Sequence, residues 1–159
     1  MGKKITKAIP VIAAVNEVAW YAQEKDNLGA LSVKARWNLK KNIKELEGIA
    51  TQYREFRNTL EDELRAKYSN DDMSTESEID DGNGNMVPGR TVKDEYLDDF
   101  HKDTAEMQRK LDELLYDNED VALYEIDMDA EVERMPDDAQ ISDAALDMLS
   151  LFDIEEDAD

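Results

Sequence analysis

Carboxylates are the side chains most able to do chemistry in this sequence. The chain has 40 Asp and Glu residues, a single histidine, His101, and no cysteine. Two well-spaced carboxylates can act as general acid and general base. With so many acids, however, pairs four residues apart arise by chance, and no nucleophile elbow or phosphate-binding glycine loop accompanies them. We therefore expect a solvated acidic face and predict a non-enzymatic protein without catalytic residues or a cofactor.

Metal binding is the second chemistry that the residue types allow. Asp81, Asn83 and Asn85 stand at positions 1, 3 and 5 of an EF-hand-like loop. Position 6 is Met86 instead of glycine, and position 12 is Val92 instead of glutamate. The default interpretation is thus a turn rich in Asn, Asp and Gly, and weak binding of a divalent cation stays open. The lack of cysteine and of further histidines excludes thiolate sites and histidine clusters.

Charge is distributed very unevenly along the chain. Residues 1–70 contain 13 Lys and Arg against 9 Asp and Glu, whereas residues 71–159 contain 6 against 31. A surface of one sign repels polyanions such as nucleic acid and anionic lipid, and it attracts a partner of the opposite sign. We therefore expect no direct binding of nucleic acid, and a protein partner with a basic surface.

The apolar pattern predicts a mainly α-helical single domain over residues 1–159. It indicates a first short helix at residues 9–24 and a long helix at residues 32–68, where apolar side chains recur at steps of four and three. The same spacing returns at residues 93–117. Residues 69–92 lose it and are rich in turn formers, which predicts a flexible or hairpin-like connector. The expected fold is a long antiparallel helical hairpin, coiled-coil-like.

Opposite charges should support the pairing of the two long helices. Antiparallel pairing brings the basic start of the first long helix beside the acidic end of the second. The bases are Lys34, Arg36, Lys40, Lys41 and Lys44, and the acids are Asp112, Glu113 and Asp117. Trp37 lies among these bases, and we expect it to be a core or interface anchor and not a stacking platform for nucleic-acid bases.

Residues 118–159 are predicted to form a small acidic cap of one strand and one helix on this hairpin. Apolar and polar side chains alternate from Val121 to Met128, which is typical of a strand. A single strand cannot stand alone, so we expect a partner strand at Asn85–Val87 or Lys3–Thr6.

The cap also carries the sharpest indication of function. Ser142 is placed to cap a short helix at Ala144–Leu151. From Asp117 to Asp159 there are 17 acids and one base, Arg134, interspersed with apolar residues that a disordered tail would not need. Such a segment suits binding to a basic, grooved protein surface, and the alternative is a packed cap with a solvated exterior. The residues that we expect to contact a partner are Tyr124, Asp127, Asp129, Phe152, Asp153, Glu155 and Glu156.

The N-terminus imitates a signal peptide. Three lysines in the first seven residues precede an apolar run at residues 9–15, but Asn16 and Glu17 interrupt that run. It is also much shorter than the roughly 20 residues that a membrane span requires. We expect a soluble, intracellular protein without membrane contact.

Three stretches of the chain resemble a family of small proteins of unknown function from tailed phages and prophages. They are residues 33–46 (VKARWNLKKNIKEL), residues 53–57 (YREFR) and the late apolar and acidic run at residues 141–156. The resemblance covers most of the chain and implies neither a catalytic residue nor a cofactor. The acidic connector is longer here than in the family pattern. The resemblance implies action in the cytoplasm of an infected bacterial host.

The sequence leaves three non-enzymatic functions open. We favour an accessory protein that binds and modulates or inhibits a host protein, such as an anti-phage defence protein. The alternatives are a component or chaperone of virion or tail assembly, and a DNA mimic that blocks a nucleic-acid-binding protein. A homo-oligomer is also open, because a coiled-coil seam can close within one chain or between two.

Overall fold

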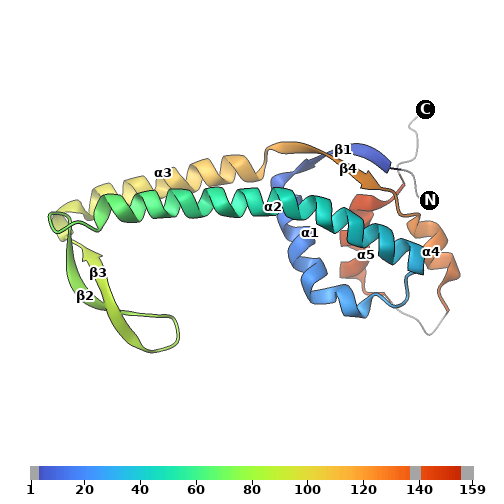
Figure 1. Ribbon diagram of the computed structural model, residues 1–159, viewed down its shortest axis with the longest axis horizontal. Helices are drawn as coiled ribbons and strands as arrows, with labels where there is room; N and C mark the ends of the chain where they lie inside the picture. The colour runs from blue at the N-terminus through green and yellow to red at the C-terminus, as the bar shows by residue number, and fades with distance from the viewer. Residues whose placement is uncertain (1–3, 137–140, 155–159) are drawn as a thin grey trace. The chain divides into compact units, whose positions relative to one another are not determined.

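The computed structural model of the protein describes residues 4–136 and 141–154 (Figure 1). The chain divides into two compact units, which we call unit 1 (Met1–Gln52 and Leu115–Asp159) and unit 2 (Tyr53–Leu114). The elements are, in chain order, β1 (Lys4–Pro10), α1 (Val11–Glu24), η1 (Lys25–Asn27), α2 (Val33–Tyr68), β2 (Ser74–Asp80), β3 (Met86–Val92), η2 (Asp94–Tyr96), α3 (Leu97–Leu115), β4 (Asn118–Tyr124), α4 (Met128–Arg134), α5 (Asp143–Leu149) and η3 (Ser150–Phe152).

Unit 1 contains a two-stranded antiparallel sheet formed by β1 and β4. Lys4 lies opposite Tyr124 and Pro10 lies opposite Asn118. Both strands alternate exposed and inward-facing side chains, so that Ile9 and Leu123 enter the core. The N-terminal strand is one of the two expected partners for the C-terminal strand, and it continues to Pro10. Helix α1 therefore begins at Val11, two residues later than predicted.

The core of unit 1 joins the sheet to α1, to the first part of α2 and to α5. Ala35, Leu39, Ile43 and Leu46 on α2 are buried at steps of four and three, so one face of the helix points inward. Leu149 of α5 is fully buried in the same cluster. Each fully buried aliphatic side chain of this kind contributes about 1.5–3 kcal/mol to folding. The predicted long helix at residues 32–68 is confirmed by α2.

Unit 2 contains the second part of α2, the hairpin of β2 and β3, and α3. Strands β2 and β3 are antiparallel, with Ser74 opposite Val92 and Asp80 opposite Met86. The hairpin turn needs Gly82 and Gly84, because both adopt positive φ angles of 90° and 84°. Figure 1 shows α3 running antiparallel beside the second part of α2.

The predicted architecture, a helical hairpin with a short N-terminal helix and one C-terminal strand-plus-helix cap, is wrong. The described residues form five α-helices and two small antiparallel sheets. Most of the segment 69–92, predicted as a connector, is the hairpin of β2 and β3. Its strands were hard to detect because β2 (STESEID) is polar on both faces and has no apolar alternation. The residues 93–117 form η2 and then α3, which begins only at Leu97.

The C-terminal part of unit 1 also differs from the prediction. The strand β4 ends at Tyr124, and Asp127 then caps a helix, α4, that the sequence pattern did not reveal. The short helix α5 is where the pattern placed it, because the Ser142 hydroxyl accepts a hydrogen bond from the Ala145 amide at 3.1 Å. Ile141 packs partly buried against the core beside it.

Candidate binding surfaces

Two of the predicted partner-binding acids hold the start of α4. The Asp127 carboxylate accepts a hydrogen bond from the Ala130 amide at 3.0 Å, as an N-cap does. The Asp153 carboxylate accepts from the Met128 amide at 3.1 Å and from the Ile154 amide at 2.9 Å. Both acids therefore fix local structure, and Asp127 remains exposed to solvent while doing so.

The predicted aromatic anchors have different positions from those expected. Phe152 is only 3% exposed and belongs to the core of unit 1, so it is not accessible to a partner. Tyr124 is half-buried at the end of β4. Asp129 is exposed in the first turn of α4. Glu155 and Glu156 lie outside the described residues.

Other apolar side chains are exposed among these acids. Val132 is 49% exposed and Ile154 is 47% exposed. Val132 shares the outward side of α4 with Asp129 and Glu133, because these positions are three and four residues apart. Asp127 is a typical N-cap residue and could have indicated this helix, but it lies within the stretch from Val121 to Met128 that the alternation predicts as a strand. Ile154 follows Asp153, whose carboxylate binds the Met128 amide at the start of α4. We call Asp127, Asp129, Val132, Glu133 and Ile154 the α4 face.

A second exposed surface lies on the first three turns of α2. Its outward side carries the bases that were predicted to pair with acids of the same chain. None of these five bases makes an ion pair with a described residue of unit 1, the unit in which they lie. They are Lys34, Arg36, Lys40, Lys41 and Lys44. Two of their predicted partners bind elsewhere, since Asp112 accepts from Gln108 and Glu113 pairs with Arg109.

Trp37 stands in the middle of these bases, and it is not a core residue. It is 56% exposed, and Val33 one turn earlier is 74% exposed. The Lys41 ammonium lies 5.3 Å from the centre of the Trp37 ring and 4.8 Å from that of Tyr124. These are cation–π distances. We call Val33, the five bases and Trp37 the basic α2 face.

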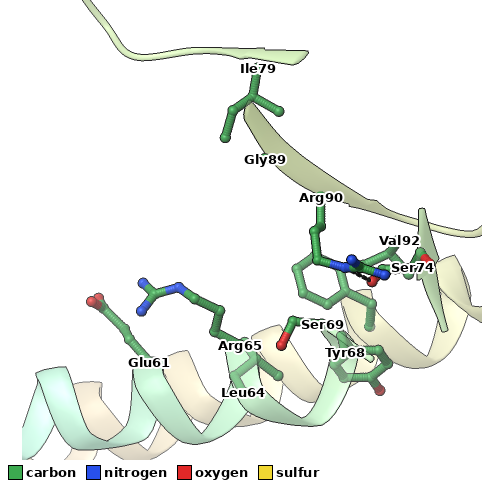
Figure 2. A pocket seen from close by; sticks show the side chains of 11 residues that line it. Glu61, Leu64, Arg65, Tyr68, Ser69, Ser74, Ile79, Gly89, Arg90 and Val92 are labelled. Carbon is green, nitrogen blue, oxygen red and sulfur yellow. Dashed lines mark hydrogen bonds between the residues drawn. The ribbon is translucent and has the colours of Figure 1, made fainter. Parts of the chain in front are cut away.

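Unit 2 contains an apolar groove of about 550 Å³. Figure 2 shows α2 residues such as Glu61, Leu64 and Arg65 on one side and Ile79 of the hairpin on the other. Gly89 makes room for Ile79, because a Cβ at this position would lie 2.5 Å from the Ile79 Cδ1 atom. The volume is in the range of small-ligand sites.

The polar groups at this groove are already engaged. The Arg90 guanidinium donates to the Ser74 hydroxyl and to the Asp71 carboxylate, both at 2.7 Å. It therefore fastens the start of β2 to β3. Arg65 pairs with Asp62 at 2.7 Å on the exposed surface of α2. The groove thus offers apolar walls but no set of convergent free polar groups that would define a ligand.

The acidic hairpin turn uses its carboxylates internally. Asp80 accepts from the Gly82 amide at 2.9 Å, and Asp81 accepts from the Asn83 amide at 2.8 Å. Across residues 4–136 and 141–154, no group of three or more His, Asp or Glu side chains is arranged to hold a metal ion. Nor is any helix in these ranges long and apolar enough to cross a membrane.

One acid in unit 1 is buried without a hydrogen-bond partner. Glu17 on α1 is 4% exposed, and its Oε2 atom has no partner among the described residues. Burial away from water raises the pKa of this carboxyl to about 8. Glu17 is therefore mostly protonated at neutral pH.

Compared with protein-family models, with curated proteins and with solved structures, the chain matches none. The α4 face and the basic α2 face of unit 1 are the candidate binding surfaces.

Proposed function

We propose that the protein is a non-enzymatic accessory protein that binds a partner protein with a basic surface through the α4 face. The observation that carries this proposal is the exposure of Val132 and Ile154 among carboxylates. The side chains of Asp129 and Glu133 form no ion pair with a described residue, so their charge is available to a partner. Two half-exposed apolar side chains supply contact area that a purely solvated acidic face lacks.

The fixed geometry of the α4 face supports the same proposal. The helix is fastened at both ends, by Asp153 at the Met128 amide and by Arg134, which donates to the Ala30 carbonyl at 3.1 Å. The buried side chains Met128 and Glu131 hold its inner side. A surface that is ordered before binding loses little conformational entropy when the partner arrives.

The sequence resemblance to small phage proteins supports a role in an infected bacterial host. In this role the chain modulates or inhibits a host protein, for which an anti-phage defence protein is the leading candidate. If the chain instead acts in virion or tail assembly, the protein that it binds should be a phage structural protein. The exposed carboxylates favour one further candidate, a DNA mimic, which would occupy the nucleic-acid groove of its target.

Capture from a bacterial lysate with matched variants tests the proposal. We expect the double variant Val132→Ser/Ile154→Ser and the double variant Asp129→Asn/Glu133→Gln each to weaken capture of the same protein. The control Glu63→Gln/Asp72→Asn removes two exposed acids from unit 2 and should leave capture unchanged.

The pattern of losses separates the candidates. A DNA mimic would lose its partner on charge neutralisation and on addition of competing DNA, but it would tolerate Val132→Ser/Ile154→Ser. Capture that is insensitive to both double variants would contradict the α4 face as the binding surface. Turnover of a small substrate by the pure chain would contradict a non-enzymatic function.

A further inference from the structure

The basic α2 face is a continuous surface on one side of the helix. Residues 33, 36, 37, 40, 41 and 44 follow the helical repeat along the outward side, opposite the buried Ala35, Leu39 and Ile43. The segment from Val33 to Lys44 contains five bases and no acid. This concentration of positive charge stands out in a chain with a net charge of −21.

The fold gives no structural reason for this composition. Five bases side by side repel one another, and the described residues of unit 1 supply no ion pair that offsets this repulsion. Trp37 contributes little to the core, because more than half of its side chain is exposed. An exposed tryptophan among bases is the composition of a binding surface, where tryptophan and arginine supply much of the affinity.

The surface is also held in place before any partner binds. The Ser32 hydroxyl caps α2 by accepting from the Ala35 amide at 3.1 Å, and Glu131 accepts from the Ser32 amide at 2.6 Å. Further along, Asn42 is hydrogen-bonded to the backbone of Tyr124. The Tyr124 ring therefore lies beside Lys41, and Lys4 approaches the same ring to 5.3 Å.

A hollow next to Trp37 can receive an apolar side chain. It has a volume of about 290 Å³. Tyr21, Leu28, Val33 and Trp37 form apolar parts of its wall. The bases Lys25, Arg36 and Lys40 line it as well. An occupant that suits this wall has one apolar or aromatic group and negative charges beside it.

We propose that the basic α2 face binds a short acidic segment of a partner protein, with an aromatic or aliphatic side chain of that segment placed in the hollow beside Trp37. The charge complementarity is direct, because five unpaired bases face an acidic peptide. This surface is separate from the α4 face and selects the opposite sign of charge.

A short acidic segment suits the limited length of this surface better than nucleic acid does. The loop that leads into α2 is joined to α4, because Arg134 donates to the Ala30 carbonyl and Glu131 accepts from the Ser32 amide. A long polyanion that continues past this end of the basic α2 face approaches the acidic helix α4, whose charge repels it. A segment of a few residues ends before it reaches this helix.

The net charge of the chain disfavours a second copy as the occupant. Each copy carries a net charge of −21, so two copies repel each other at the low ionic strength where the basic face is most attractive. A partner with an isolated acidic segment does not carry this penalty.

Fluorescence anisotropy with a labelled synthetic peptide tests the proposal. The probe is a short peptide of Asp and Glu with one Trp and one Leu, and the control peptide has Asn and Gln in place of the acids. We expect the acidic peptide to bind the full chain at low salt at least about tenfold more tightly than the neutral peptide.

Matched variants locate the site. Lys40→Gln/Lys41→Gln and Trp37→Ala should each weaken peptide binding by about tenfold, because each removes exposed contacts at the centre of the surface. The control Arg54→Gln/Lys110→Gln removes two exposed bases from unit 2 and should change binding by less than about twofold. Circular dichroism should show that the variants, all at exposed or partly exposed positions, are folded.

Several results would overturn the proposal. Equal binding of the neutral peptide would show that negative charge is not recognised. Equal losses of affinity in the control variant would show that the peptide does not bind specifically at the basic α2 face. Tighter binding of a single-stranded oligothymidine than of the acidic peptide would assign the surface to nucleic acid. Self-association that Lys40→Gln/Lys41→Gln abolishes in sedimentation would assign it to a second copy.

Discussion

The side chain of Asn42 forms two hydrogen bonds with the backbone of Tyr124. Its Nδ2 atom donates to the Tyr124 carbonyl at 2.8 Å, and its Oδ1 atom accepts from the Tyr124 amide at 2.7 Å. Asn42 is fully buried on α2, and Tyr124 is the last residue of β4. The Asn42 side chain therefore makes the pair of backbone hydrogen bonds that a neighbouring strand would make. It joins α2 to the end of β4.

Substitution of Asn42 should destabilise unit 1 strongly. In Asn42→Ala the carbonyl and the amide of Tyr124 both lose their partner, and each unsatisfied buried group costs about 1–3 kcal/mol. We expect the free energy of unfolding to fall by about 2–4 kcal/mol, as measured by urea denaturation followed by circular dichroism. The control Asn58→Ala, at an exposed position of α2, should change it by less than about 0.5 kcal/mol. A loss in Asn42→Ala no larger than in the control would show that the two bonds contribute little.

Glu131 connects α4 to the start of α2, and its substitution provides a second test of unit 1. Its carboxylate accepts from the Ser32 amide at 2.6 Å and lies at the positive end of the helix dipole. We expect Glu131→Ala to lower the free energy of unfolding by about 1–3 kcal/mol and Glu131→Gln to lower it by less, since glutamine keeps the acceptor. Glu133→Ala, an exposed acid of the same helix, is the control. Equal losses in Glu131→Ala and Glu131→Gln would indicate that the charge matters and the acceptor does not.

The long helix could be predicted because its buried side chains repeat regularly. On α2 the spacing of Leu39, Ile43 and Leu46 is the direct consequence of one face packing in the core, so periodicity alone located the helix to within one residue. The hairpin of unit 2 could not be found in this way. Its strand β2 has neither face buried along its length, and the turn residues at Asp80–Asn85 were the only local signal.

The candidate surfaces were predictable in kind but not in position. The sequence shows that residues 117–159 mix acids with apolar side chains, and it does not show which of these side chains are needed for the core. The sequence predicts Phe152 to be an exposed anchor, but it is buried. Val132 is exposed, because α4 turns its inner side, Met128 and Glu131, to the core. Opposite charges at suitable helix ends predict pairing of the α2 bases with Asp112, Glu113 and Asp117, whereas Asp112 and Glu113 bind Gln108 and Arg109 of their own helix.

A polar contact in unit 2 joins α3 to the end of α2. Asp103 accepts hydrogen bonds from the Tyr68 hydroxyl at 2.5 Å and from the Lys67 ammonium at 2.6 Å. The Tyr68 ring also packs edge-to-face on Phe100, with ring centres 5.2 Å apart. The side chain at this position therefore ties α3 to the end of α2 by hydrogen bonds, where an apolar residue would do so by packing.

This contact predicts that the protein loses stability at low pH, through Asp103, and at high pH, through Tyr68. The hydrogen bonds to Asp103 lower the pKa of its carboxyl below the usual 3.8 and raise the pKa of the Tyr68 phenol above 10.0. The stability from Asp103 is therefore present above pH 3.8 and is lost as the pH falls through its lowered pKa, whereas that from Tyr68 is lost as the pH rises through its raised pKa. NMR titration of the tyrosine Cζ resonances should show the Tyr68 pKa decreasing towards 10.0 in Asp103→Asn. The exposed Asp98→Asn is the control, and an unchanged Tyr68 pKa in Asp103→Asn would contradict the assignment.

Glu17 predicts that the protein loses stability as the pH rises through neutrality. Its pKa is about 8 in the folded chain and 4.5 when exposed, so the folded state binds more protons between these values and the free energy of unfolding falls with increasing pH. The slope from this group approaches ~1.4 kcal/mol per pH unit in the middle of that range and vanishes above it. Urea denaturation at a series of pH values should show that Glu17→Gln removes this slope and is more stable than the original chain at pH 8. Glu24→Gln, at the end of the same helix, is the control and should retain the slope. Parallel stability profiles for Glu17→Gln and the original chain would show that the buried carboxyl does not titrate in this range.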